Sequence, residues 1–479
     1  MFKALGYHTF AKVVVVFAAY ILHFCLGKVL SVDEYGVIGT VIAFCNFYYM
    51  FLTNGVRQGI SKSLSVKEYD NTDVVKKGMM LQTIFSIALS VINFALAPMF
   101  AKAFGDPAFE KYIMLISMLI PLTAIYFAFT GGLNGTKLFL QEAIVIMIYP
   151  MLRLTSIPLA LVFDSDKPTG IIFGFSLASL LAAILASAML LQNKKFKQKR
   201  ENAKKLTNKS MLKISFEFII FFASITMILN MDTFFLQYVC KDTELTGYYT
   251  GVHTFSLVPY YLISAFYLVI LPYVSENYVK GDMKKVKDVI AKNFNIITVF
   301  ILPITALIAT TGPELLSCFY SKEYYQAGNA LSILCMGTFF LSSFAVLNVV
   351  LNGMNCKKLT KSLSVITVAI DVALLYFLIP IWGLEGAAIA TTVSALFGCI
   401  VSLIYLIKKI GNPFDLTTMG KAVVLVMIFV IACRVVFNFI KVHNLIALIA
   451  IYAAFGLAYL LCVILFKIVD VKSLVEKKK

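Results

Sequence analysis

Eight ionisable residues within or at the ends of long apolar runs are candidates for function, because a charge in such a run is costly. No motif in the sequence points to catalysis, because the four histidines form no His-Glu-x-x-His pattern and no Gly-x-x-x-x-Gly-Lys loop is present to hold a nucleotide. The nine cysteines are scattered, without the Cys-x-x-Cys spacing of a zinc or redox site. We therefore expect no enzyme, no cofactor and no metal site. The eight residues are Lys12, His23, Lys28, Arg57, Arg153, Asp232, His253 and Asp371.

Composition places these residues in a membrane. Of 479 residues, 60% are apolar and only 14% are charged, too few to cover the surface of a soluble protein. The apolar runs of about 20 residues match the length that a helix needs to cross about 30 Å of hydrocarbon. We predict an all-α polytopic membrane protein with fourteen transmembrane helices. The predicted spans are 10–30, 36–57, 78–101, 112–133, 143–163, 170–191, 214–239, 247–272, 293–312, 327–350, 362–381, 386–407, 421–440 and 445–466.

Lysine and arginine are distributed unevenly between the two sides of these spans. Thirty-three of the 42 fall on the side of both chain ends, and seven fall on the other side. Cytoplasmic loops carry such an excess, so both termini are predicted to be cytoplasmic. This topology accounts for the net charge of +17 without a nucleic-acid partner. The basic run 194–200 is interpreted as a loop held against anionic lipid.

An internal repeat organises the chain. Leu133-Asn134-Gly135 recurs as Leu351-Asn352-Gly353, 218 residues later, and a looser match pairs 34–39 with 246–251 at an offset of 212. Steady offsets predict two parallel repeats of six helices each, an architecture found in transporters. The predicted parts are an N-terminal six-helix lobe (1–192), a basic cytoplasmic linker (193–213), a C-terminal six-helix lobe (214–410), and two additional helices with a basic tail (411–479).

Three segments are similar to the polysaccharide transporter (oligosaccharide flippase) family of the multidrug/oligosaccharidyl-lipid/polysaccharide exporter superfamily. They are Leu-Ser-Val-Asp-Glu-Tyr-Gly-Val-Ile-Gly at 30–39, Gly-Val-Arg-Gln-Gly-Ile-Ser-Lys at 55–62, and Pro-Ile-Trp-Gly-Leu-Glu-Gly-Ala-Ala-Ile-Ala-Thr at 380–391. The resemblance implies a V-shaped transporter that moves undecaprenyl-diphosphate-linked oligosaccharide across the bacterial cytoplasmic membrane by alternating access. It also implies a monomer surrounded by membrane lipids, with glycosyltransferases and a polymerase of the same pathway as partners.

The resemblance further implies a cationic cavity that binds the diphosphate, and arginine suits this role because its planar fork matches phosphate oxygens. Arg153, about halfway along the fifth span, is the leading candidate; its alternative role is a bond within its own lobe. Arg57, Lys12 and Lys28 stand near span ends, where interaction with lipid headgroups is the alternative. The last two helices are expected to form a groove for the lipid tail, and Arg434 belongs to them.

Acids and histidines are the candidates for coupling or gating. The repeat offset of 218 places Asp371 at the position equivalent to Arg153, so the two are hypothesised to pair across the cavity in one state and separate in another. Asp232 resembles a recurrent acidic position of the family. His23 and His253 titrate near neutral pH when unperturbed and are candidates for proton coupling.

Three alternative functions fit the sequence less well. A multidrug/toxin cation antiporter has the same fold, but usually twelve spans and an acid in the first span, where this chain has none. A lipid II flippase has fourteen spans, but its pattern places several arginines in the first two spans, where only Arg57 stands here. A membrane glycosyltransferase or polymerase normally has a large outer loop, and every predicted outer loop of this chain is short.

Overall fold

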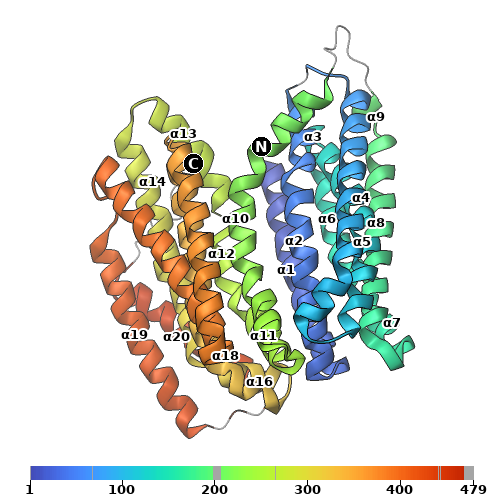
Figure 1. Cartoon of the computed structure of the whole chain (residues 1–479). Helices are drawn as coiled ribbons and strands as arrows, with labels where there is room; N and C mark the ends of the chain where they lie inside the picture. The colour runs from blue at the N-terminus through green and yellow to red at the C-terminus, as the bar shows by residue number, and fades with distance from the viewer. Residues whose placement is uncertain are drawn as a thin grey trace. The chain divides into compact units, whose positions relative to one another are not determined.

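The computed structural model describes residues 2–66, 68–197, 206–264, 266–440, 442 and 444–468 (Figure 1). Across these residues the chain is helical and contains no β-strand. Eleven of the described helices are long and apolar enough to cross a membrane. The prediction of an all-α polytopic membrane protein is thereby confirmed, whereas the count of fourteen spans stays a prediction.

The chain folds into two compact units, Met1–Thr250 and Gly251–Lys479. The boundary lies within a helix and not in the basic segment 193–213, because the helix that follows this segment packs along α2 and α3 of the first unit. The predicted six-helix lobes stay a prediction. The helices of the first unit are α1 (Phe2–Val29), α2 (Val32–Asn54), α3 (Val56–Ser65), α4 (Asn71–Phe104), α5 (Ala108–Gly135), α6 (Phe139–Arg153), α7 (Ser156–Val162), the 3₁₀ turn Asp164–Asp166, α8 (Lys167–Leu191), α9 (Lys194–Lys197), α10 (Asn208–Cys240) and the first part of α11 (Thr243–Ser256).

The second unit continues from α11 with shorter, interrupted helices and then longer ones (Figure 1). A π-helical turn, Ile297–Ile301, joins α14 to α15. The turn ends directly before Leu302 and Pro303, the first two residues of α15. The helices are α12 (Val258–Ser264), α13 (Tyr267–Val279), α14 (Met283–Ile296), α15 (Leu302–Thr310), α16 (Gly312–Phe319), the 3₁₀ turn Lys322–Ala327, α17 (Gly328–Gly353), α18 (Lys357–Ile410), α19 (Leu416–Phe439) and α20 (Leu445–Leu465).

Helix α18 is two antiparallel helices joined at Gly383. Its 54 residues would extend about 80 Å as one straight helix, far more than a membrane needs. Gly383 has φ 53° and ψ −120°, outside the helical region. The segments before and after Gly383 contact each other. Ser394 Oγ donates to Asp371 Oδ1 at 2.8 Å, and a Cβ on Gly398 would lie 3.0 Å from Thr367 Oγ1. The chain therefore folds back where the turn between the eleventh and twelfth spans was predicted.

The repeated Leu-Asn-Gly motif forms the same turn twice. A residue in the left-handed region follows each motif, Lys137 at φ 59° and Asn355 at φ 62°. The next amide, that of Leu138 or Cys356, donates to the carbonyl five residues earlier at 2.9 Å in both turns. The backbone thus repeats at the offset of 218 that the sequence predicts.

Two glycines let α2 and α11 approach closely in the first unit. A Cβ on Gly36 would lie 1.8 Å from the carbonyl oxygen of Thr243, and a Cβ on Gly247 would lie 2.0 Å from that of Val32. The approach is reciprocal, because Thr243 lies four residues before Gly247 and Val32 lies four residues before Gly36. Only a residue without a side chain allows backbones to come this near. The pair lies in the segments that the looser repeat match aligns.

The fold of α18 gives a direct test with a control in the same helix. Ser394→Ala should lower the free energy of unfolding by about 1–3 kcal/mol, because the buried Asp371 carboxylate loses a donor. Ser402→Ala should be neutral or slightly stabilising, since the Ser402 hydroxyl is buried without a hydrogen-bond partner in the described part of the chain. Thermal unfolding in detergent measures both. Equal melting temperatures for the two variants would contradict a stabilising role for the Ser394–Asp371 bond.

Candidate functional site

Arg153 ends α6, where the helix is interrupted. Pro158 has no N–H to give to the carbonyl of Leu154, and the amide of Ile157 takes that carbonyl instead, at 3.1 Å. A short α7 begins at Ser156 after this turn. The interruption leaves Arg153 on the last turn of α6, within the apolar stretch Phe139–Val162.

The charge of Arg153 has little to balance it. Its guanidinium carbon lies 3.9 Å from the centroid of the Phe175 ring of α8. Among the described residues no carboxylate lies within 4.0 Å of it, and its Nε is buried without a hydrogen-bond partner. A cation–π contact contributes about 0.5–2 kcal/mol, whereas a charge in the bilayer costs several kcal/mol. The site is therefore suited to an anion.

Hydroxyl groups form a row near this cation. Thr123 Oγ1 donates to the Tyr49 hydroxyl at 3.5 Å and lies 3.0 Å from Ser179 Oγ, which in turn lies 3.4 Å from the Tyr149 hydroxyl. Tyr149 precedes Arg153 by about one turn of α6, and Ser179 follows Phe175 by about one turn of α8, so the row lies near the guanidinium. The row joins α2, α5, α6 and α8, so the packing of four helices brings a cation and several hydroxyls into one region of the first unit.

Arg57, in contrast, is paired. Its Nη2 donates to Glu142 Oε1 at 3.0 Å, and its Nε donates to Thr130 Oγ1 at 3.1 Å. The other carboxylate oxygen of Glu142 accepts from Asn134 Nδ2 at 2.7 Å and lies 3.5 Å from His8 Nε2. The Glu142 side chain is 1% exposed. We refer to these residues as the Glu142 cluster; it joins α1, α3, α5 and α6.

Sequence reasoning missed Glu142, because it stands at the edge of the fifth span with no charged neighbour along the chain. The repeat carried the signal that would have found it. Glu142 is eight residues after Asn134, and Thr360 is eight residues after Asn352. Thr360 Oγ1 donates to Asn352 Oδ1 at 2.7 Å, so both positions bond the asparagine of the repeated turn.

The three candidate residues of α1, Lys12, His23 and Lys28, differ in how exposed their side chains are. Lys12 and Lys28 are exposed, and the Lys28 ammonium lies 5.8 Å from the centroid of the Phe24 ring. His23 is half-buried, with Nδ1 2.7 Å from the hydroxyl of the buried Tyr35 in α2. The histidine therefore links α1 to α2, and the two lysines lie on the surface of α1.

The acids are held by hydroxyl and amide donors. Asp232 in α10 is 1% exposed and accepts from the Tyr249 hydroxyl at 2.8 Å and the Thr233 amide at 2.7 Å. Asp371 is fully buried in α18, beside Ser394. His253 is half-buried in α11. Arg153 belongs to the first unit and Asp371 to the second, so their pairing stays a prediction.

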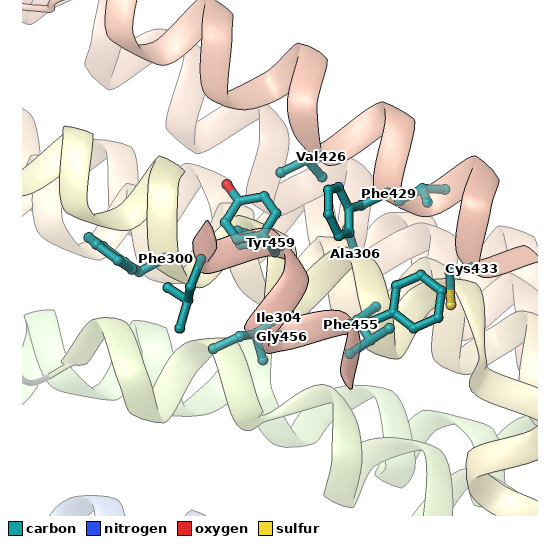
Figure 2. Close-up of a pocket in the computed structure, with 13 residues that line it drawn as sticks. Phe300, Ile304, Ala306, Val426, Phe429, Cys433, Phe455, Gly456 and Tyr459 are labelled. Atoms are coloured by element: carbon teal, nitrogen blue, oxygen red, sulfur yellow. The ribbon is translucent and has the colours of Figure 1, made fainter. Parts of the chain in front are cut away.

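An apolar cavity of about 310 Å³ lies in the second unit between the π turn, α15, α19 and α20 (Figure 2). Beside it on α19, Arg434 is about half exposed, with Nη1 3.4 Å from the carbonyl oxygen of Thr310 and 3.8 Å from Glu314 Oε1. The lining is aliphatic and aromatic, and comprises Phe300, Pro303, Ile304, Ala306, Leu307, Val426, Phe429, Val430, Cys433, Phe455, Gly456, Tyr459 and Leu460.

Solved structures with this fold are membrane transporters. The lipid II flippase MurJ in an inward closed conformation matches with a TM-score of 0.77 and 14% identity, over 98% of this chain and 99% of that one. An inward-facing multidrug resistance MATE family transporter of the MOP superfamily matches with a TM-score of 0.67 and 14% identity, over 82% of this chain and 94% of that one. A MOP superfamily transporter from Pyrococcus furiosus matches with a TM-score of 0.63 and 13% identity, over 86% and 96%. At such identities the likeness shows the fold.

The fold is thus that of solved membrane transporters, and the long apolar helices define a multi-pass membrane protein. Residues 25–329 match the family described as polysaccharide biosynthesis protein, and because this is more than half of the chain, the protein belongs to that family. The predicted family membership is confirmed. An uncharacterized membrane protein of Methanocaldococcus jannaschii is 26% identical over 216 residues, which are 44% of this chain and 42% of that protein. The match thus spans less than half the length of this relative.

Proposed function

We propose that this protein is a flippase that moves undecaprenyl-diphosphate-linked oligosaccharide repeat units across the bacterial cytoplasmic membrane for surface polysaccharide synthesis. The observation that carries the proposal is Arg153, a partly buried cation without a carboxylate partner among the described residues, in a membrane protein of the polysaccharide biosynthesis family. A diphosphate supplies the negative charge that this site lacks. The hydroxyl row from Tyr49 to Tyr149 offers donors and acceptors to the adjoining sugar.

Arginine explains both capture and release of such a substrate. A bidentate bond from the guanidinium to phosphate oxygens is strong and directional. The Phe175 ring covers one face of the Arg153 guanidinium, so its charge is partly stabilised when no substrate is bound. Because that contact is weaker than an ion pair, the cation remains available to the diphosphate. Arg57, Lys12 and Lys28 are proposed as further cations along the route.

The cavity beside α19 and α20 is proposed to hold part of the lipid tail (Figure 2). Its lining is apolar, and each buried CH₂ group contributes about 0.8 kcal/mol. The headgroup and the tail then have separate sites of matching chemistry, a cation for the diphosphate and an apolar groove for the isoprenoid. The Arg434–Glu314 pair places polar groups next to Cys433 of this lining.

Transport by alternating access requires elements that respond to substrate or ions. Asp232, His23 and His253 are proposed to couple or gate, since each is at least half-buried in a helix of the membrane-spanning fold. Both termini are proposed to be cytoplasmic on the lysine and arginine distribution. The protein is proposed to act as a monomer that receives its substrate from glycosyltransferases and passes it to a polymerase.

Lipid II flipping is the second candidate, because the lipid II flippase matches over 98% of this chain. Its substrate also carries an undecaprenyl diphosphate, so the proposed cation and groove fit both functions. The two differ in which lipid accumulates when the protein is absent.

The first test identifies the lipid that accumulates when the protein is absent. Cells without the protein should accumulate lipid-linked oligosaccharide in the inner leaflet, and the wild-type gene should restore transport. Arg153→Ala should reduce transport at least tenfold, because the diphosphate loses its cation, whereas Lys361→Ala on the exposed face of α18 should behave as wild type. Thin-layer analysis of extracted lipids measures this. Accumulated lipid II would establish the second candidate, and normal lipids with altered drug sensitivity would favour an antiporter.

A second test concerns the matched charges of the repeat. Arg153→Asp and Asp371→Arg should each abolish transport, and the double variant should restore a measurable part of it if the two side chains pair in one state. Transport in reconstituted vesicles measures the effect. Three equally inactive variants at equal expression would contradict the pairing.

A third test fills the groove. Gly456 lines the cavity and a Cβ on it would contact nothing within 4 Å, so Gly456→Leu should fold normally and occupy the space of the tail. We expect weaker binding of a polyprenyl diphosphate, by about tenfold, with unchanged melting temperature. Gly420→Leu is the matched control, because Gly420 is equally open but does not line the cavity. Equal affinities for the two variants would remove the groove from the proposal.

A further inference from the structure

The Glu142 cluster contains more charge than its turn requires. In the second half of the chain, the equivalent turn is closed by Thr360, a neutral side chain that bonds Asn352 at 2.7 Å. The backbone of the two turns agrees in its left-handed residue and in its hydrogen bonds. The repeat is therefore an internal control, and it shows that the fold of the turn does not need a carboxylate.

The acid occurs together with its cation. Arg57 donates to Glu142 in the first half. In the second half, the offset of 212 places the apolar Val269 at the position of Arg57, and the offset of 218 places Thr360 at the position of Glu142. A carboxylate is thus present where an arginine is present and absent where it is absent. The hydrogen bond to the asparagine is thus common to both turns, whereas the negative charge of Glu142 occurs together with Arg57.

The two oxygens of Glu142 serve different partners. Oε1 accepts from Arg57, while Oε2 accepts from Asn134 and faces His8. Breaking a buried ion pair by removing one partner is costly, because the remaining charge is left without compensation. Here the carboxylate keeps Asn134 and His8 when Arg57 departs. Arg57 can therefore exchange its partner at a lower cost than an isolated pair would allow.

We propose that Glu142 is a positioning residue that occupies Arg57 when no substrate is bound and yields it to the diphosphate of an incoming lipid. The inference rests on the proposed function. Glu142 holds the guanidinium with one carboxylate oxygen, in the place that a phosphate oxygen takes on binding. When the substrate leaves, the carboxylate takes Arg57 back and so favours release. His8, 25% exposed and 3.5 Å from Oε2, stabilises the carboxylate during the exchange.

Charge-neutral substitution tests the exchange. Glu142→Gln keeps an oxygen for Asn134 but gives Arg57 no counter-ion, so we expect farnesyl diphosphate to bind about tenfold more tightly than to wild type. Transport should become slower, because release is no longer assisted. Thr360→Ala, at the equivalent turn, should change neither the affinity for farnesyl diphosphate nor the rate of transport. Combining Arg57→Ala with Glu142→Gln should remove the gain. Affinity is read from ligand-induced shifts of the melting temperature in detergent.

His8→Ala provides a second variant that does not depend on the folding of Glu142→Gln. Without His8, the carboxylate relies more on Arg57, so diphosphate binding should weaken, by about threefold or more. If His8 has only a structural role, His8→Ala should leave the affinity for farnesyl diphosphate unchanged, because His8 does not contact Arg57. Inorganic diphosphate is tested beside farnesyl diphosphate, and we expect the larger change for the lipid, because its tail holds the headgroup at the site.

The outcomes separate the two proposals. If wild type binds farnesyl diphosphate and Glu142→Gln binds it equally or more weakly while remaining folded, the role of Glu142 is wrong and the flippase proposal stands. If wild type binds neither probe, the flippase proposal itself is contradicted. A tighter Glu142→Gln variant with slower transport, together with a weaker His8→Ala variant, establishes the exchange.

Discussion

Placing charge in a medium without water is the constraint on which the rest of this structure depends. A bilayer offers no solvent to an ion, so each buried charge must be stabilised by neighbouring groups. The protein does this in three ways. Asp232 receives a tyrosine hydroxyl and a backbone amide, Glu142 receives an arginine and an amide, and Arg153 lies against an aromatic ring. Of these three charges, only that of Arg153 stays largely unbalanced, because an aromatic ring stabilises a cation less than an ion pair does. Arg153 is for this reason the leading candidate to bind an anionic substrate.

Interruptions of helices determine where these groups stand. Gly55 separates α2 from α3 two residues before Arg57, and the turn before Pro158 ends α6 at Arg153. Gly383 reverses the chain so that Asp371 meets Ser394. In each case a glycine or proline at which the regular helix is interrupted lies close in sequence or in space to a polar side chain. Such breaks are tolerated at membrane depth where they are covered by protein.

The internal repeat has kept its backbone and changed its side chains. The turns after Gly135 and Gly353 share a left-handed residue and a hydrogen-bond pattern. Their asparagines bond to a glutamate in one half and to a threonine in the other. Since the backbone does not depend on which of these is present, the first half could acquire a charged cluster without loss of fold. The asymmetry between the two turns is consequently chemical and not architectural.

The sequence by itself determined the class of protein, because apolar runs of spanning length and the positive-inside bias depend on composition and order alone. It also located the repeat and the reversal near Gly383, since glycine, proline and short motifs act locally. Tertiary structure decided which charges are neutralised. Arg57 and Glu142 are 85 residues apart, and Arg153 meets Phe175 only because α6 packs on α8. Such partners come from helix packing, which a single sequence does not encode in any local pattern.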